Sequence, residues 1–196
     1  MNSPLRHSAV FLDRDGTIIR EVNYLSRLDE IELLPAAAAA IAKLNQLRIP
    51  VILVTNQSGV ARGKFTEAFV RESHSYLQKL LQKQNARIDD FFYCPHHPEA
   101  GNLPYRKTCS CRKPAPGMLL AAAEKHNLNL KRSYVIGDKL IDIELGLKAG
   151  AKAILVETGY GRKEKEQIKT SQINPNKICV DLNQAVDWIL PQLNLN

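Results

Sequence analysis

The sequence predicts an α/β fold in which a parallel sheet is covered by helices on both faces. Short, nearly continuous apolar runs alternate along the chain with stretches of helical periodicity. Apolar runs of this kind are typical of strands that are buried on both faces. Strands that alternate with helices form a parallel sheet with the helices packed against it. At 196 residues, we expect one domain, residues 1–196.

The apolar runs place the expected strands at 8–12, 51–54, 91–94, 134–136 and 153–156. Helical spacing places the expected helices at 35–47, 66–84, 116–127, 141–149 and 181–193. Thr66 is a suitable N-cap for the second helix, because its hydroxyl can accept a backbone hydrogen bond. Pro35 and Pro116 suit first helical positions, and Gly150 is expected to end the helix before it.

The chain carries 27 lysines and arginines against 20 aspartates and glutamates, a formal net charge of +7. The basic residues are dispersed and only 6% of residues are aromatic, so the stacking pattern of a nucleic-acid surface is lacking. A positive field also attracts small phosphorylated molecules. We therefore expect a phosphorylated substrate and do not expect nucleic acid as a partner.

Several features predict a reduced, cytoplasmic protein that does not span a membrane, and we expect the chain to act as a monomer. No apolar run approaches the ~20 residues that a transmembrane helix needs. The polar start of the chain, residues 1–7, does not resemble a signal peptide. Three of the four cysteines lie between positions 94 and 111, interleaved with histidines. In a reducing compartment, that pattern favours a metal site over disulfides.

Two aspartates follow the first expected strand, at positions 13 and 15. Asp13 and Asp15 alternate on an extended segment, so their side chains point the same way. Ligands of parallel sheets bind beyond the carboxyl ends of the strands. Two crowded carboxylates need a cation or a proton, and Mg²⁺ prefers oxygen ligands. The alternative is an Asp-rich turn to which Gly16 gives a permissive backbone.

Polar residues follow further strands. After the second strand come hydroxyl, amide and backbone donors suited to phosphate oxygens, at Thr55, Asn56, Gln57, Ser58 and Gly59. Asp138 follows the fourth strand and could be a second metal ligand. Arg112 and Lys113 precede a helix and could neutralise phosphoryl charge. Each of these three groups also has a structural alternative. Residues 55–59 could form a turn, Asp138 could cap a helix, and Arg112 and Lys113 could be an exposed basic pair. Taken together, the three groups favour a phosphate site.

The order Asp13-x-Asp15-Gly16-Thr17, Thr55-Asn56, Lys113 and Gly137-Asp138 resembles the four motifs of haloacid dehalogenase-type phosphatases. The resemblance covers about residues 8–156 and implies a Rossmann-like sheet. It also implies hydrolysis of a phosphate monoester through an aspartyl-phosphate on a nucleophilic aspartate.

The resemblance assigns roles to individual residues. Asp13 would be the nucleophile, and Asp15 the general acid and then the general base. Thr55 and Lys113 would stabilise the transferring phosphoryl group. Mg²⁺ would be held by Asp13, by Asp138 and by the backbone carbonyl of Asp15. Asp142 is a weaker candidate near the same metal.

Cys94, His96, Cys109 and Cys111 form a second candidate metal site. Three thiolates and an imidazole suit a closed tetrahedral zinc site of structural type. Alternation along an extended chain puts Cys94 and His96 on one side and His97 on the other. The alternative is a disulfide among these cysteines.

The zinc loop, at about 94–111, and the segment 55–63 resemble one branch of the family. Its members remove the 7-phosphate of a heptose 1,7-bisphosphate, which yields heptose 1-phosphate for nucleotide-activated heptose and lipopolysaccharide core. The branch lacks a large cap. A histidinol-phosphate phosphatase shares the loop and is the main alternative, ahead of a nucleic-acid 3′-end phosphatase and a non-catalytic zinc module. The resemblance implies substrate contacts at Glu21, Val22, Asn23, Tyr24, Asn56, Gln57, Ser58, Arg112 and Lys139.

Overall fold

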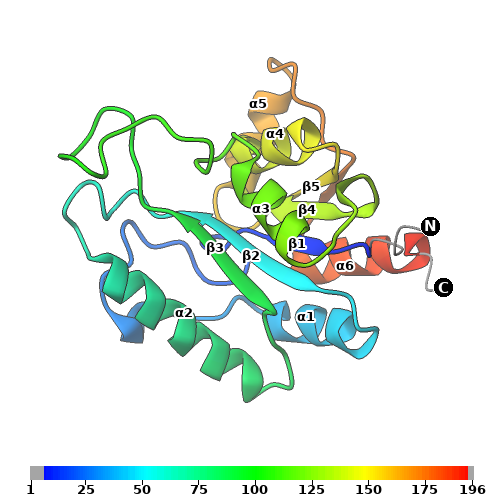
Figure 1. Cartoon of the computed structure of the whole chain (residues 1–196). Helices are drawn as coiled ribbons and strands as arrows, with labels where there is room; N and C mark the ends of the chain where they lie inside the picture. The colour runs from blue at the N-terminus through cyan, green and yellow to red at the C-terminus, as the bar shows by residue number, and fades with distance from the viewer. Residues whose placement is uncertain (1–6, 194–196) are drawn as a thin grey trace, which may run out of the picture.

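The computed structural model describes residues 7–193 and contains a six-stranded sheet (Figure 1). The strands are β1 (Val10–Leu12), β2 (Val51–Asn56), β3 (Asp90–Cys94), β4 (Tyr134–Gly137), β5 (Lys152–Val156) and β6 (Lys177–Cys179). Their order across the sheet is β3-β2-β1-β4-β5-β6, and every neighbouring pair is parallel. The carboxyl ends of all strands therefore meet at one edge, with β1 in the middle.

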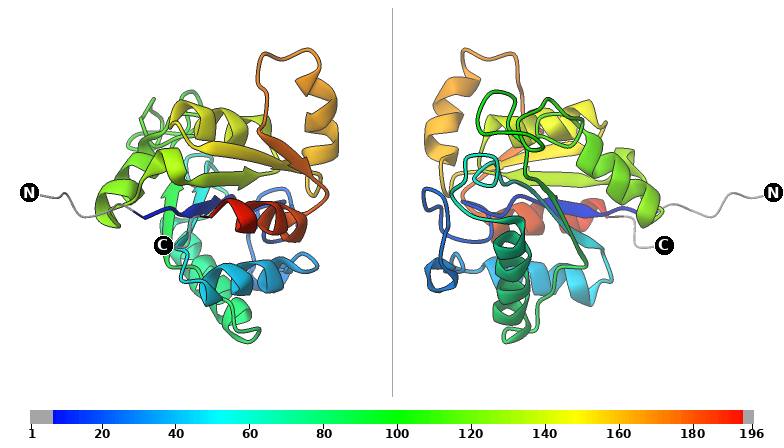
Figure 2. Two further views of the ribbon diagram at one scale, coloured as in Figure 1. Left: turned by 90° about the vertical axis from the view of Figure 1, so that its right-hand side faces the viewer. Right: turned by 60° about the vertical axis from the view of Figure 1, so that its left-hand side comes forward.

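Helices cover both faces of this sheet (Figures 1 and 2). One face carries α1 (Ala37–Gln46), α2 (Glu67–Gln82) and α6 (Leu182–Ile189), and the other carries α3 (Gly117–Lys125), α4 (Leu140–Lys148) and α5 (Gly161–Ile168). Short 3-10 helices lie at Leu28–Glu30, Leu130–Arg132 and Leu190–Gln192. The layers confirm the predicted fold class.

Alternate residues of the central strand, β1, pack into the two layers of the hydrophobic core on either side of the sheet. Val10 and Leu12 pack with α1, α2 and α6, whereas Phe11 packs with α3 and α4. All residues of β1 and β4 are buried. The nearly continuous apolar runs in the sequence arise because both faces of these strands are covered.

The observed helix boundaries agree with those predicted from the sequence at some ends and differ from them at others. Thr66 caps α2 as predicted, since its Oγ1 accepts a hydrogen bond from the Phe69 N–H at 3.1 Å. Pro35 does not open α1, because Ala36 adopts a left-handed conformation with φ of 61° and the helix begins after it. Pro116 is the N-cap of α3 and not its first helical residue.

The sequence analysis missed α5 and β6. Within α5 only Gly161 is buried, so the helix has no apolar stripe to detect, and β6 has only three residues. The expected helix 181–193 ends at Ile189, with a 3-10 turn beyond it, because Pro191 lacks the N–H that would continue the helix. Within residues 7–193, every helix is too short or too polar to cross a membrane. Most of the expected polar start, residues 1–6, lies outside the described residues.

Candidate active site and metal centre

A pocket of about 290 Å³ opens at the carboxyl edge of the sheet, beside the ends of β1 and β2. Most of the residues that the sequence nominated line it: Asp13, Asp15, Glu21, Val22, Asn23, Tyr24, Thr55, Asn56, Gln57, Ser58, Lys113 and Lys139. Asp138 is completely buried, and the Arg112 side chain does not line the pocket. Phe65 and Tyr160, which the sequence did not single out, also form part of the wall.

The buried ammonium of Lys113 lies between two carboxylates. Its Nζ is 2.8 Å from Asp13 Oδ1 and 2.6 Å from Asp142 Oδ1, and it donates to the Val54 carbonyl at 3.2 Å. Burial opposes the charge on Lys113, but the two carboxylates outweigh this effect and raise its pKa. A positive charge is thus held directly beside Asp13 at the end of β1.

Asn56 holds the backbone of Lys113 in place. Its Oδ1 accepts the Lys113 N–H at 3.0 Å, and its Nδ2 donates to the Lys113 carbonyl at 3.2 Å. The sequence analysis assigned Asn56 to substrate binding. That role stays a prediction, since Asn56 also lines the pocket. In the structure its amide group joins the end of β2 to the segment that leads into α3.

The carboxylates of Asp13, Asp138 and Asp142 form a buried acidic cluster, with one oxygen of each within 4.8 Å of the others. Asp138 Oδ2 accepts the Tyr160 N–H at 2.8 Å, while its Oδ1 has no hydrogen-bond partner within residues 7–193. Burial and then the other two carboxylates raise the pKa of Asp138 to about 8. A buried carboxylate oxygen without a partner, in a set of oxygen donors, fits a hard divalent cation such as Mg²⁺.

The carboxylate of Asp15 is held from two sides. The Arg14 guanidinium donates to it through Nε and Nη2 at 3.0 to 3.2 Å. Gln57 Nε2 donates to Asp15 Oδ2 at 3.1 Å and to Thr55 Oγ1 at 3.0 Å. The sequence analysis did not single out Arg14, and neither of these contacts follows from spacing along the chain.

An ion pair stands at the entrance of the pocket. Lys139 Nζ is 2.9 Å from Glu21 Oε2 and lies 4.6 Å from the centre of the Tyr160 ring. Burial raises the pKa of Glu21, against the opposing effect of Lys139. Burial likewise opposes the charge on Lys139, but nearby carboxylates, Asp138 first, outweigh it and raise its pKa. The pocket is therefore lined here by the Lys139–Glu21 ion pair, with the Lys139 ammonium over the Tyr160 ring.

The second predicted cluster also comes together in space. The sulfur atoms of Cys94, Cys109 and Cys111 lie 3.2 to 3.5 Å apart, and His96 Nδ1 lies 3.4 Å from Cys111 Sγ. A disulfide bond measures about 2.05 Å. The edge of a tetrahedron with 2.3 Å zinc–sulfur bonds is about 3.8 Å. The sulfur atoms are thus too far apart for a disulfide, and the four side chains are grouped closely enough to hold a zinc ion.

His97 lies outside this cluster. Its Nδ1 accepts the backbone N–H groups of Glu99 and Ala100 at 3.1 and 2.9 Å. The structure thus places His96 with the cysteines and uses His97 to order the loop that follows.

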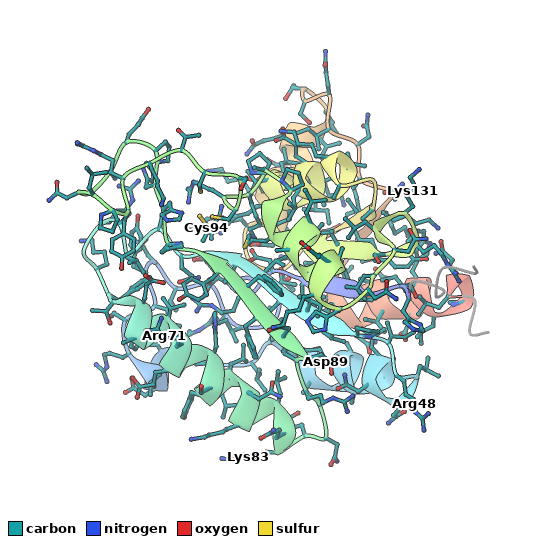
Figure 3. All side chains as sticks on the ribbon, in the orientation of Figure 1. Arg48, Arg71, Lys83, Asp89, Cys94 and Lys131 are labelled. Carbon is teal, nitrogen blue, oxygen red and sulfur yellow. The ribbon has the colours of Figure 1, made fainter. Side chains whose placement is uncertain are left out.

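The segment around the cysteine cluster, residues 94–113, is anchored to α2 and leads directly to Lys113. Glu67 on α2 accepts the hydroxyl hydrogens of Tyr93 and Tyr105 at 2.7 and 2.8 Å. Arg112 donates to the His96 carbonyl at 3.1 Å. Cys94, labelled in Figure 3, stands at the end of β3, where the segment begins. The cluster therefore fixes the path of the chain into the pocket.

Comparison with known protein families and curated sequences relates the chain to hydrolases. A family model described as HAD-hydrolase-like matches residues 110–185. A D-glycero-D-manno-heptose-1,7-bisphosphate 7-phosphatase of Thermosynechococcus vestitus is 41% identical, over 94% of this chain and 96% of the relative. A D-glycero-beta-D-manno-heptose-1,7-bisphosphate 7-phosphatase of Escherichia coli is 36% identical, over 94% of this chain and 89% of the relative.

Solved structures show the same similarity. A D,D-heptose 1,7-bisphosphate phosphatase from B. bronchiseptica, crystallised with magnesium and phosphate, aligns with a TM-score of 0.84 and 33% identity. The alignment covers 94% of this chain and 99% of that one. A putative HAD-like phosphatase from Mesorhizobium loti aligns with a TM-score of 0.83 and 33% identity, over 98% of this chain and 89% of that one.

Replacing Cys109 by alanine removes one of four candidate zinc ligands. We expect the zinc content of the purified protein to fall from about one ion per chain to a small fraction, and the thermal unfolding temperature to drop, because metal binding is coupled to folding. Cys179→Ala is the matched control, since Cys179 is buried in β6 and outside the cluster. Full zinc content and an unchanged unfolding temperature in Cys109→Ala would show that the ligand set is wrong.

Proposed function

The chain belongs to the haloacid dehalogenase-like hydrolases as a phosphatase, and we propose that it removes the 7-phosphate of D-glycero-D-manno-heptose 1,7-bisphosphate. The observation that carries this proposal is the pairing of Asp13 with the buried Lys113 in a small polar pocket at the end of β1. The names of relatives that match almost the full chain support the substrate. The product would be heptose 1-phosphate, for nucleotide-activated heptose and the lipopolysaccharide core.

In the proposed mechanism, an oxygen of Asp13 bonds to phosphorus while the bond from phosphorus to the sugar oxygen breaks. Asp15 gives its proton to that oxygen, which leaves as the hydroxyl of the product. Asp15 then takes a proton from the water that hydrolyses the aspartyl-phosphate and releases phosphate. Both carboxylates line the pocket, which supports their assignment to one reaction.

Charge compensation allows an anionic phosphoryl group to approach a carboxylate. Lys113 supplies one positive charge next to Asp13, and Thr55 offers a hydroxyl in the same wall. Mg²⁺ would be held by Asp13, Asp138 and the backbone carbonyl of Asp15, and would neutralise the charge of the phosphoryl oxygens. The unpartnered Asp138 Oδ1 supports this site. So does the magnesium named with the B. bronchiseptica phosphatase.

The rest of the substrate would occupy the entrance. Lys139 and Tyr160 offer a cation and an aromatic face there, and residues 21–24, of which Glu21 pairs with Lys139, also line the pocket. A sugar carrying a second phosphate has an anionic end that such a cation can bind. Arg112 would have to turn away from the His96 carbonyl to take part.

The substrate is tested by comparing kcat/KM for heptose 1,7-bisphosphate with that for histidinol phosphate. We expect the heptose substrate to be favoured by at least about tenfold, which corresponds to about 1.4 kcal/mol of transition-state preference. A tenfold preference for histidinol phosphate would overturn the assignment, while the phosphatase mechanism would stand.

Asp13→Asn should reduce turnover below detection and leave the fold unchanged. The variant loses the nucleophilic charge but keeps the shape of the side chain and its position at the end of β1. Turnover of heptose bisphosphate and the circular dichroism spectrum are measured together. Asp29→Asn is a suitable control because Asp29 lies in an exposed turn outside the pocket. Activity of Asp13→Asn near that of the unaltered enzyme would exclude Asp13 as the nucleophile.

Mg²⁺ at millimolar concentration should raise the thermal unfolding temperature by several degrees, because an ion that binds only the folded state stabilises it. In Asp138→Asn, the same addition should have little effect, since the amide does not carry the charge that the ion needs. The shift is measured within each variant, so a lower starting stability of Asp138→Asn does not affect the comparison. Equal shifts in both proteins would place the ion elsewhere.

A further inference from the structure

A second pocket, which the mechanism above does not use, lies beside the candidate active site. It has a volume of about 680 Å³ and is formed mainly by two loops, residues 60–64 after β2 and residues 100–105 in the segment around the cysteine cluster. We call it the loop pocket. Tyr24 lines both this pocket and the active-site pocket, so the two share a wall. The volume is within the range of sites that hold small molecules.

The two loops that form the loop pocket are fixed against each other by backbone contacts (Figure 1). The Ala61 N–H donates to the Pro95 carbonyl at 3.2 Å. Gly101 approaches the Ala61 carbonyl so closely that a Cβ on Gly101 would collide with its oxygen. The second loop is closed by His97, whose N–H donates to the Tyr105 carbonyl at 3.1 Å. The shape of the loop pocket is therefore largely set before a ligand enters.

The loop pocket carries positive charge that no carboxylate compensates. Arg62 and Lys64 line it with exposed side chains, and none of the lining residues within 7–193 is acidic. Neither of these cations forms an ion pair in the part of the chain that the structure describes. In the active-site pocket, by contrast, Lys139 pairs with Glu21. Arg62 and Lys64 are therefore available to an anion from solution.

His97 supplies a second hydrogen-bond donor next to Arg62. Its Nδ1 accepts the backbone N–H groups of Glu99 and Ala100, so the ring hydrogen is on Nε2. Arg62 Nη2 lies 2.8 Å from that Nε2. Both atoms are therefore donors, and they converge on one place without accepting from each other. An oxygen that accepts from both, as a phosphate oxygen does, satisfies the two donors after a small shift of the exposed Arg62 side chain.

We propose that the loop pocket binds a phosphate group, with Arg62 as its main ligand, Lys64 as a second cation and the His97 ring N–H as a further donor. Guanidinium groups bind phosphate oxygens through paired hydrogen bonds. Since the chain is a phosphatase, its substrate and its product both carry this group. The second phosphate of a bisphosphate substrate is one source, if it extends past Tyr24. Free phosphate is the other source, if Lys139 holds the second phosphate of the substrate.

The test is a titration of the protein with inorganic phosphate, followed by amide NMR spectra. We expect the amide signals of Gly63, Gly101 and Asn102 to shift along one saturable curve at millimolar phosphate. In Arg62→Gln, the affinity derived from these signals should fall about tenfold, which is the effect of losing one hydrogen bond to a charged group. Glutamine at this position can still accept from the His97 ring, so the loop keeps its order.

Arg162→Gln is the matched control, because it removes the charge of an exposed arginine of α5 that lines neither pocket. Its titration should match that of the unaltered protein. Lys64→Gln is a second variant of the loop pocket and should also weaken the affinity. The proposal is overturned if the loop amides do not respond to phosphate. An unchanged response in Arg62→Gln overturns it as well, since the shifts would then arise from the active-site pocket.

Enzyme kinetics distinguish the two sources of the phosphate group. If the loop pocket holds the second phosphate of the substrate, Arg62→Gln should raise KM for heptose 1,7-bisphosphate about tenfold relative to KM for p-nitrophenyl phosphate, which has a single phosphate. If the pocket holds free phosphate, this ratio stays at the value of the unaltered protein while the titration still differs.

The titration requires no turnover and is therefore independent of the proposed function. A preference for histidinol phosphate, or an active Asp13→Asn variant, would overturn the proposed substrate or mechanism. Either result would leave the response of the loop amides, and its loss in Arg62→Gln, as a valid test of the loop pocket.

Discussion

The ammonium of Lys113 is the contact on which the organisation of the site depends. It joins Asp13 at the end of β1 to Asp142 in α4 and to the Val54 carbonyl in β2. Ammonium and carboxylate groups are costly to bury singly and become tolerable only when they are paired and hydrogen-bonded. Since Lys113 and Asp142 are each about 1% exposed, neither has water as an alternative partner. The position of Asp13 and the position of Lys113 therefore determine each other.

The path that brings Lys113 to this place is set by the cysteine cluster. Cys111 is two residues before Lys113, and Gly117 at the start of α3 donates its N–H to the Ser110 carbonyl at 2.9 Å. A Cβ on Gly117 would lie 2.3 Å from that carbonyl oxygen, so only glycine allows the helix to begin so close to the loop. Glu67 anchors Tyr93, at the start of the loop, and Tyr105, near its middle, to α2. A structural metal would therefore act on the pocket through the backbone.

The sequence was sufficient for what depends on local order and insufficient for contacts between distant residues. Apolar runs and the cap at Thr66 follow from neighbours in the chain, and so does the position of Asp13 after a strand. In contrast, Gln57 contacts Asp15 across 42 positions and Arg14 contacts Ser73 across 59. No spacing rule connects such pairs. For the same reason the sequence predicts Asn56 and Gln57 only as substrate contacts, and it gives no sign that their amides hold Lys113 and Asp15.

Gly16 illustrates how a turn and a candidate metal site can require the same residue. Its φ of 80° lies in the left-handed region, which fits a turn with a permissive backbone. A Cβ at Gly16 would also lie 2.2 Å from Asp138 Oδ2, and one at Gly159 would lie at the same distance from that oxygen. Both backbones thus approach the carboxylate that the Tyr160 N–H also contacts. Because Oδ2 is surrounded in this way, Asp138 can present only Oδ1 to a cation. The close approach of Gly16 and Gly159 to Oδ2 therefore determines which carboxylate oxygen is left for the cation.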